Sequence, residues 1–308
     1  MAKATRAAFG EAILELGAKH PDLVVLDADL SASTMTRKFS ETYPDRHFNV
    51  GIAEGNMVGI GAGLALAGKK PFVCSFACFV VGRFEQIRMS VAYNRAPVRI
   101  VGTHVGIGIG EDGYSQMGLE DIALMRSLPN VAIVQPGDEK EARQAVEFLV
   151  EYNEPSYIRL TRQKLEDING EDYRFEFGKG VVFQEGQDVA LLATGGVVYN
   201  TLQAAKQLQD DGVRATVINI HSIRPLDEEL ILDAAATCRR VVTVEDHSVN
   251  GGLGGAVAEL LSERRPTRMK RIGMRTFGES GSPEALYEKY GFSADGIRKS
   301  VLEFVKQA

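Results

Sequence analysis

The sequence predicts an α/β protein of two successive three-layer domains, with a parallel sheet in the first and a mostly parallel sheet in the second. Two observations predict this fold class. Short apolar runs alternate with stretches of helical periodicity, and strands buried on both faces of a parallel sheet have this nearly continuous apolar character. One polar, glycine-marked segment, residues 165–180, interrupts the alternation. We therefore place the domain boundary within that segment.

The predicted elements follow one another in a regular order. In the first half the strands are 23–26, 71–75, 98–102, 131–134 and 157–160, and the helices are 5–19, 56–67, 84–93, 119–128 and 139–152. The second series has strands at 188–193, 215–220 and 241–245 and helices at 201–210, 227–235 and 254–261. We predict one domain over residues 1–170 and another over residues 171–308, each long enough to bury its own core.

The composition limits the kinds of partner. The formal net charge is −6 and no basic stripe is visible, so we expect no nucleic-acid partner. The longest apolar run, residues 72–81, is much shorter than the ~20 residues that span a bilayer, and no apolar signal segment stands near the N-terminus. The three cysteines predict neither a disulfide framework nor a metal site. We expect a cytoplasmic protein that contacts no membrane and binds no metal through this chain.

The most informative segment is residues 51–68, GIAEGNMVGIGAGLALAG. Ten of its eighteen residues are Gly or Ala, and Glu54 is its only charged residue. Each glycine costs a helix ~1 kcal/mol relative to alanine, so several together indicate close packing against another helix or subunit. Glu54 has two interpretations at this stage. It either complements the positive end of the helix or is a carboxyl shielded from water that can donate a proton.

Two further segments have the character of a ligand site. Phe76 and Phe79 are three residues apart, so they either face one flat ligand together or belong to the core. Residues 102–120 leave a predicted strand with His104, five glycines from Gly106 to Gly118, and Asp112. Residues 108–113 match G-x-G-x-x-G, but these glycines do not open a helix, so we reject a dinucleotide fingerprint. A glycine-rich loop after a parallel strand remains the expected place for a ligand.

Together these segments resemble the C-terminal half of transketolase, a thiamine-diphosphate enzyme. The motifs occur in the order of that family and cover nearly the whole chain: DADLSAS at 27–33, GIAEGNMVGIGAGLALAG at 51–68, THVGIGIGEDG at 103–113, LEDIALMRSLPN at 119–130, YIRLTRQ at 157–163, HSIRPLD at 221–227 and VEDHSVNGGLGGAVAE at 244–259. The resemblance implies a pyrimidine-binding domain followed by a transketolase C-terminal domain, and it assigns the second domain to subunit contacts.

One family motif is absent. The G-D-G sequence with a trailing Asn, which holds Mg²⁺ and the diphosphate, does not occur in this chain, where residues 110–113 read G-E-D-G. The resemblance therefore implies one subunit of a split transketolase. A separate N-terminal subunit would hold Mg²⁺ or Ca²⁺ and the diphosphate of the cofactor, in an α2β2 heterotetramer.

The resemblance also implies roles for residues that contact the cofactor. Glu54 matches the glutamate that shares a proton with N1′ of the aminopyrimidine ring, which is general acid–base chemistry. Phe79 matches the aromatic side chain that stacks on this ring, with Phe76 beside it. Asp29 and Leu30 match positions near the central ring of the cofactor.

A second set of residues matches the substrate site of the family. The phosphate of the sugar would be bound by four of them, whose guanidinium, hydroxyl and imidazole groups suit a phosphate monoester: Arg6, Ser33, His104 and Arg162. Asp112 matches a residue that hydrogen-bonds a sugar hydroxyl. Gln116 stands where common transketolases have a histidine, and Gly82 stands where an aromatic residue follows the Phe pair. We expect both departures to affect substrate preference rather than cofactor chemistry.

The resulting hypothesis is transfer of a two-carbon ketol unit from a ketose phosphate to an aldose acceptor, active only with the separate N-terminal subunit. Two alternatives stay open. The first is the β subunit of a 2-oxo acid dehydrogenase E1 component, which shares the domain pair and an equivalent glutamate. The second is a non-catalytic nucleotide-binding or regulatory subunit built on GGLGG at residues 251–255, although a tight strand-to-helix turn is the simpler interpretation of that motif.

Overall fold

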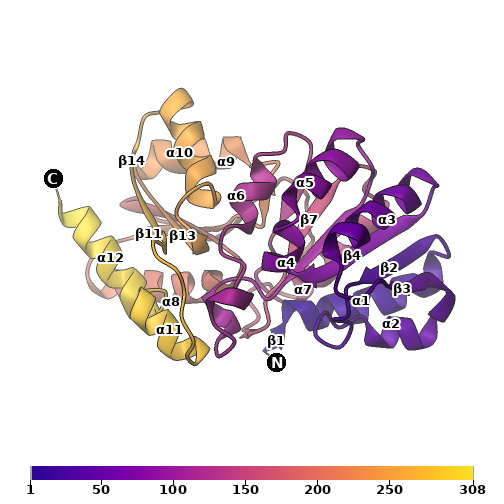
Figure 1. Cartoon of the computed structure of the whole chain (residues 1–308). Coiled ribbons are helices and arrows are strands. Elements are labelled where there is room, and N and C mark those ends of the chain that lie inside the picture. Colours follow the sequence, from indigo (N-terminus) through magenta and orange to yellow (C-terminus); the bar gives the residue numbers. More distant parts are fainter. Residues whose placement is uncertain (1, 308) are drawn as a thin grey trace.

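The computed structural model describes residues 2–307, so residues 1 and 308 of the two predicted domains lie outside it. Two layered units lie side by side, each with a parallel-dominated sheet between helices, and residues 166–180 connect them (Figure 1). This arrangement confirms the predicted fold class. Within residues 2–307 no helix is both long and apolar enough to cross a membrane.

The sheet of the first unit has seven strands in the order β12-β6-β7-β5-β4-β2-β3. All neighbours are parallel except β12 and β6. The bounds are β2 Leu23–Asp27, β3 His47–Asn49, β4 Lys70–Phe76, β5 Arg99–Thr103, β6 Ala132–Val134, β7 Ser156–Arg159 and β12 Ser222–Arg224. The central strands β2, β4, β5 and β7 match the apolar runs predicted from the sequence, because they are covered by helices on both faces.

Helices cover both faces of this sheet and form two separate apolar cores. The core on one face contains residues of α1 (Thr5–Lys19) and α7 (Glu139–Glu151), and the core on the other contains residues of α3 (Glu54–Leu66) and α6 (Asp121–Arg126). The shorter helices are α2 (Arg37–Thr42), α4 (Ala77–Val81) and α5 (Phe84–Gln86). The helix predicted at 84–93 is interrupted, because a π-helical segment, Ile87–Tyr93, follows α5.

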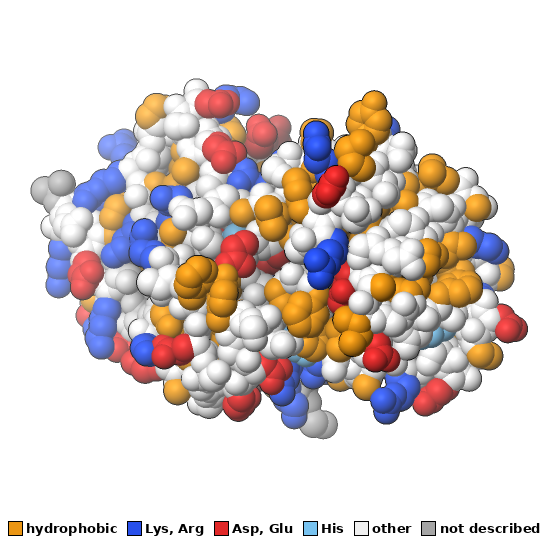
Figure 2. Space-filling view, viewed as in Figure 1, with side chains coloured by type: hydrophobic (Ala, Val, Ile, Leu, Met, Phe, Trp, Pro, Cys, Tyr) orange, Lys and Arg blue, Asp and Glu red, His pale blue; other side chains and the backbone are white. Residues whose placement is uncertain are grey.

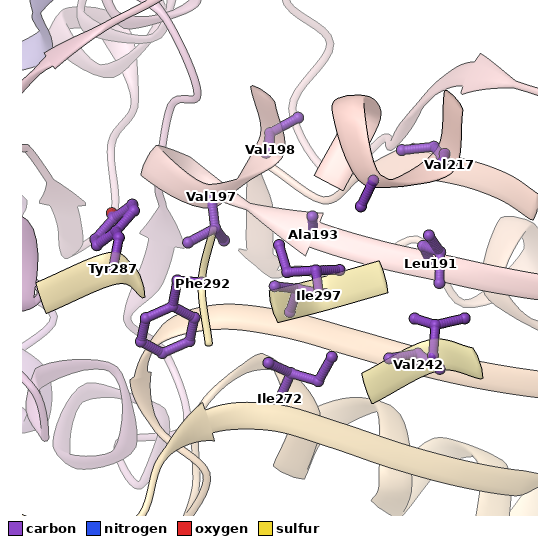
Figure 3. Packing of buried hydrophobic residues seen from close by; sticks show 14 of the residues in the cluster. Leu191, Ala193, Val197, Val198, Val217, Val242, Ile272, Tyr287, Phe292 and Ile297 are labelled. Carbon is purple, nitrogen blue, oxygen red and sulfur yellow. The ribbon is translucent and has the colours of Figure 1, made fainter. Parts of the chain in front are cut away.

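The second unit has a five-stranded sheet in the order β14-β13-β10-β11-β9, parallel except for β9. Its strands are β9 Val181–Gln184, β10 Val189–Thr194, β11 Ala215–Asn219, β13 Arg240–Ser248 and β14 Arg268–Met274. The helices are α8 Val198–Asp210, α9 Glu228–Cys238, α10 Leu253–Arg264, α11 Pro283–Tyr290 and α12 Ala294–Lys306. Figure 3 shows the core between this sheet and its helices, where Leu191 and Ala193 of β10 pack near Ile297 of α12.

Two short pairings tie distant parts of the chain together. Strand β12 belongs to the second half of the sequence, yet it extends the first sheet by pairing antiparallel with β6. Strand β1 (Lys3–Ala4) pairs antiparallel with β8 (Lys164–Leu165). Neither pairing was predicted, because two- and three-residue strands leave no readable alternation in a sequence. The β1–β8 pairing brings both ends of the first unit together.

Candidate active site

The Glu54 carboxyl lies at the start of α3, where its charge complements the positive end of the helix. Only 4% of the residue is exposed. Within residues 2–307, the hydrogen bond that its carboxylate receives comes from the Ser75 hydroxyl on β4, at 3.5 Å from Oε1. The side chain therefore sits at a helix end and is also shielded from water, and its role as a proton donor stays a prediction. The carboxyl is kept in place with most of its hydrogen-bonding capacity unused.

Three stacked rings extend from the end of β4. Phe76 ends the strand and Phe79 lies in α4, with their rings parallel within 11° and the ring centres 5.3 Å apart. The other face of Phe76 contacts His104, with 3.5 Å between ring centres. Phe76 is buried, whereas Phe79 is only partly buried. Part of the Phe79 ring is therefore accessible, and Phe76 links this ring to the loop that follows β5.

Arg6 and Arg162 are brought together by the β1–β8 pairing, although 156 residues separate them in sequence. The backbone N–H of Arg6 donates to the carbonyl of Thr161, and the Thr161 N–H donates to the Thr5 hydroxyl at 2.8 Å. Burial, followed by the charge of Arg162, lowers the pKa of Arg6, so the two guanidinium groups are close enough to interact. Two like charges held together in a partly buried place indicate a site for an anion.

His104 connects this pair of arginines to the stacked rings. It leaves β5 with φ of +58°, a left-handed conformation that is costly for a side chain with a Cβ and that clusters at functional sites. Burial, followed by the charges of Arg6 and Arg162, lowers its pKa to about 3, so the imidazole is neutral near pH 7. Nε2 lies 2.9 Å from Arg6 Nη1 and Nδ1 lies 2.8 Å from the Thr103 hydroxyl. Neutral His104 therefore accepts from Arg6 through Nε2.

The Arg6 side chain retains free donor capacity. Its Nη1 donates to the Ser33 carbonyl at 2.8 Å, whereas its buried Nε has no partner within residues 2–307. Arg162 Nη1 donates to the Ile109 carbonyl at 2.9 Å and to Asp112 Oδ2 at 3.1 Å. The structure thus gathers five of the residues predicted for the substrate into one place: Arg6, Ser33, His104, Asp112 and Arg162.

The remaining predicted residues are less closely connected. Asp29 and Leu30 follow β2; Asp29 is exposed, with φ of +62°, and its backbone N–H donates to Asn49 Oδ1 at 3.0 Å. Gln116 ends a 3-10 turn, Tyr114–Gln116, and is partly exposed. Gly82 lines a pocket of about 350 Å³ between α4 and this turn. Gly82 directly follows α4, the helix that carries Phe79, and leaves this pocket without an aromatic side chain at that position.

Sequence reasoning missed a contribution from the second unit to this site. Asp246, near the end of β13, accepts backbone N–H groups of Ile107 and Gly108 in the glycine-rich loop at 2.8 and 3.3 Å. Tyr287 of α11 donates to the same carboxylate at 2.9 Å. The available signal was an acidic residue at the carboxyl end of a strand, but the sequence does not show that this strand end faces a loop of the other unit.

The GGLGG turn at residues 251–255 is already filled by the chain itself. The Glu245 carboxylate accepts the backbone N–H groups of Leu253 and Gly254, at 2.7 and 2.8 Å, at the start of α10. A Cβ at Gly252 would lie 2.0 Å from Glu245 Oε2, so the glycine is required to admit this carboxylate. A phosphate would compete with an internal anion at this helix end, which argues against the nucleotide-binding alternative.

One face of α3 is lined by small residues. A Cβ added at Gly59 or Gly63 would meet no atom within 4 Å, whereas one at Gly61 would lie 2.5 Å from Val73 Cγ2. Large apolar side chains nearby are exposed, among them Ile52 at 85%, Leu66 at 64% and Tyr93 at 78%. Figure 2 shows apolar side chains gathered over the half of the molecule that contains α3, α4 and α5. Such a patch is typical of an interface.

Within the described range, no three His, Cys, Asp or Glu side chains are grouped to hold a metal ion.

Comparison with known families identifies both halves of the chain. Residues 1–167 match the transketolase pyrimidine-binding domain, and residues 178–297 match the transketolase C-terminal domain. The chain belongs to the transketolase family. A protein of Methanocaldococcus jannaschii, described provisionally as a transketolase C-terminal section, is 44% identical over 99% of this chain and 97% of its own length.

Other relatives show the same division of the enzyme. A 6-deoxy-6-sulfo-D-fructose transketolase subunit of Clostridium sp. MSTE9 is 40% identical over 98% of this chain and 94% of its own length. A solved structure described as a split-gene transketolase, inactive beta4 tetramer, is 44% identical, with a TM-score of 0.91 and 98% of each chain covered. By contrast, the chain spans about half of longer relatives, such as 47% of a 1-deoxy-D-xylulose-5-phosphate synthase. This chain is therefore a transketolase-like C-terminal subunit.

Proposed function

We propose that this subunit, assembled with a separate N-terminal subunit, transfers a two-carbon ketol unit from a ketose phosphate to an aldose acceptor with thiamine diphosphate as cofactor. One observation carries the proposal. Glu54 accepts a hydrogen bond from Ser75, the residue before Phe76 on β4, and the Phe76 ring stacks on both Phe79 and His104. His104 in turn accepts from Arg6, beside Arg162, so a buried carboxyl, a partly exposed ring and a pair of arginines are gathered around the ends of β4 and β5.

The residues present fit the heterocyclic half of thiamine diphosphate. When bound, this cofactor supplies a carbon nucleophile and accepts the electrons of the cleaved bond. Glu54 would hold a proton at N1′ of the aminopyrimidine, and its burial keeps water from competing for that proton. Phe79 would cover the face of the ring, with Phe76 behind it. Asp29 and Leu30 would stand near the central ring.

The arginine pair supports an anionic end group on the substrate. Within the described residues Arg6 Nε is a buried donor without a partner, and neutral His104 adds no negative charge, so Asp112 offsets only part of the positive charge of the pair. A phosphate monoester would accept hydrogen bonds from Arg6, Arg162 and the Ser33 hydroxyl. Asp112, held by Arg162, would accept from a sugar hydroxyl, with Gln116 nearby on the same loop. A sulfonate carries a similar terminal charge, so the assay below includes one.

The N-terminal subunit would complete the cofactor site. No part of this chain carries the family motif for the diphosphate and its Mg²⁺ or Ca²⁺. The small-residue face of α3, formed by Gly55, Gly59 and Gly63, would admit a closely packed helix of that subunit, and the exposed Ile52 and Tyr93 would be covered beside it. Two copies of each subunit would form an α2β2 assembly. Without the partner, we expect the same face to mediate self-association of an inactive chain.

The test is to purify this chain with the subunit encoded beside it and to follow product formation from three donors. These are a ketose phosphate with an aldose acceptor, a sulfonated ketose with the same acceptor, and a 2-oxo acid. Transfer from an anionic ketose by the pair, with none by either subunit alone, is expected. Turnover of the 2-oxo acid alone would instead support the 2-oxo acid dehydrogenase alternative and refute ketol transfer. Robust turnover by this chain alone would refute the divided site.

A further inference from the structure

The loop that leaves β5 belongs structurally to the other unit. Residues 104–118, here called the glycine loop, carry His104, Asp112 and Gln116. Its apolar side chains Ile107 and Ile109 are fully buried, and they join the core cluster that contains β10, α8 and α12 of the second unit. A loop with so many glycines would otherwise be mobile, so this anchoring determines where its functional side chains lie.

The polar centre of the anchor is Asp246. Only 4% of this residue is exposed. Its carboxylate receives three hydrogen bonds, two from the backbone N–H groups of Ile107 and Gly108 and one from Tyr287. The approach is close, since a Cβ on Gly106 would lie 2.1 Å from Asp246 Oδ2. Tyr287 in turn accepts from Gln163 Nε2 at 2.6 Å. The network therefore returns to the residue next to Arg162.

The next residue of the loop links this anchor to the anion site. Ile109 follows the two residues whose amides bind Asp246, and its carbonyl accepts from Arg162 Nη1 at 2.9 Å. Arg162 also donates to Asp112 further along the loop. Displacement of the amides at 107 and 108 would therefore move both acceptors that orient Arg162.

We propose that Asp246, contributed by the C-terminal domain, is a positioning residue for the anionic end of the substrate. By fixing two backbone amides of the glycine loop, it sets the orientation of Arg162 and Asp112. Within residues 2–307 this carboxylate binds the glycine loop and Tyr287, whereas Glu54 accepts from Ser75, so we expect the acid–base end of the site to be little affected by its loss. The C-terminal domain, assigned above to subunit contacts, would thereby determine substrate affinity. The effect on substrate rests on the proposed function, whereas the effect on the loop does not.

The test compares Asp246→Asn with Glu245→Gln in the assembled enzyme. The asparagine is isosteric but presents an N–H where the carboxylate accepted, so at least one of its three partners loses its acceptor: Ile107 if the amide nitrogen replaces Oδ1, or Gly108 and Tyr287 if it replaces Oδ2. Glu245 is a matched control, because it lies on the same strand, is equally buried and also accepts two backbone N–H groups, but those belong to α10. Both variants remove one buried carboxylate, and only the first faces the glycine loop.

Three measurements decide the proposal. In Asp246→Asn we expect amide hydrogen exchange at residues 107 and 108 to accelerate about tenfold or more, and inorganic phosphate to bind about tenfold more weakly. KM for the sugar phosphate should rise similarly while kcat changes less than about threefold. Glu245→Gln should change none of these. Unchanged phosphate affinity and KM in Asp246→Asn would overturn the proposal, whatever the exchange rates do.

A second variant covers the case in which Asp246→Asn does not fold. Tyr287→Phe removes one donor to the Asp246 carboxylate and leaves both loop amides bound, so we expect changes of the same sign and smaller size. Wild-type affinity and KM in that variant would count equally against the proposal. Failure of the proposed function is separate: it would appear as no ketol transfer by the wild-type pair, while phosphate binding and amide exchange would still report on Asp246.

Discussion

The small-residue face of α3 predicts that one double substitution will stabilise the isolated chain and weaken its assembly with the N-terminal subunit. The double substitution Gly59→Leu and Gly63→Leu replaces two helical glycines that lie one turn apart. A Cβ added at either position would meet no atom within 4 Å in the isolated chain. Glycine costs a helix ~1 kcal/mol relative to a good helix former, so the pair should stabilise the isolated chain by ~2 kcal/mol. The same two side chains would occupy the space that we assign to the N-terminal subunit.

The expected shift in melting temperature follows from the size of the chain. With an unfolding entropy of about 2.1 cal/mol/K per residue, 308 residues give about 0.65 kcal/mol/K, so ~2 kcal/mol corresponds to about 3 °C. Unfolding should be followed at concentrations where light scattering gives the monomer mass, because self-association also stabilises a folded chain. Assembly is then measured by titration with the N-terminal subunit, and we expect the double variant to lose it.

Gly61→Ala is the control for direction. It lies on the buried side of the same helix, where its methyl group would clash with Val73, so the isolated chain should become less stable. If the Gly59/Gly63 double variant assembles with the affinity of the wild type, the face does not contact the partner and the reasoning is refuted. If it destabilises the isolated chain as Gly61→Ala does, the face is not open in the way the structure indicates.

Two further predictions concern single side chains. Arg162→Lys should raise KM for a ketose phosphate about tenfold and leave KM for a non-phosphorylated donor unchanged. The reason is that a lysine ammonium lacks the planar fork with which arginine can bind the Ile109 carbonyl, Asp112 and a phosphate together. Steady-state kinetics with both donors measures this difference. Burial raises the pKa of Glu141 to about 7. Between about pH 4.5 and 7 the folded chain therefore holds a proton on Glu141 that the unfolded chain has lost. This group makes the free energy of unfolding fall as pH rises through that range. Glu141→Gln removes this contribution. In urea unfolding, the free energy of unfolding of the variant minus that of the wild type should therefore be larger at pH 8 than at pH 5. The same difference at both pH values would contradict this prediction.

Most of the fold could be predicted from the sequence, because parallel strands that are buried on both faces appear as continuous apolar runs. Strands β2, β4, β5 and β7 are continuous apolar runs, and helix α1 occupies the predicted residues 5–19. What it lacked were elements too short for a period, such as β1, β8 and β12. The π-helical turn at Ile87–Tyr93 also has no signature in hydrophobic spacing. Segments after residue 261, including α11 and α12, went unassigned, although Ile297, Val301 and Phe304 of α12 stand at helical spacing and are buried on one face.

The site was predictable in composition but not in connection. Motif order selected Glu54, Phe79 and His104, and the structure links Phe79 and His104 through the ring of Phe76, with Glu54 bound to the neighbouring Ser75. Which groups meet depends on the β1–β8 pairing, and the neutral state of His104 depends first on its burial and then on the two arginines beside it. Asp246 lay beyond prediction for a related reason, since its importance comes from a contact between the two units. The assigned roles of the individual residues, and the boundary at residue 170, stay predictions.

The most direct test of the account is the rate of hydrogen–deuterium exchange at C2 of thiamine diphosphate in the assembled pair, with Glu54→Gln compared with the wild type. Glutamine keeps the size of the side chain but cannot share the proton, so we predict slowing by ~100-fold or more with the fold and cofactor affinity unchanged. Exchange at the wild-type rate in the Glu54→Gln enzyme would contradict the central role assigned to this carboxyl.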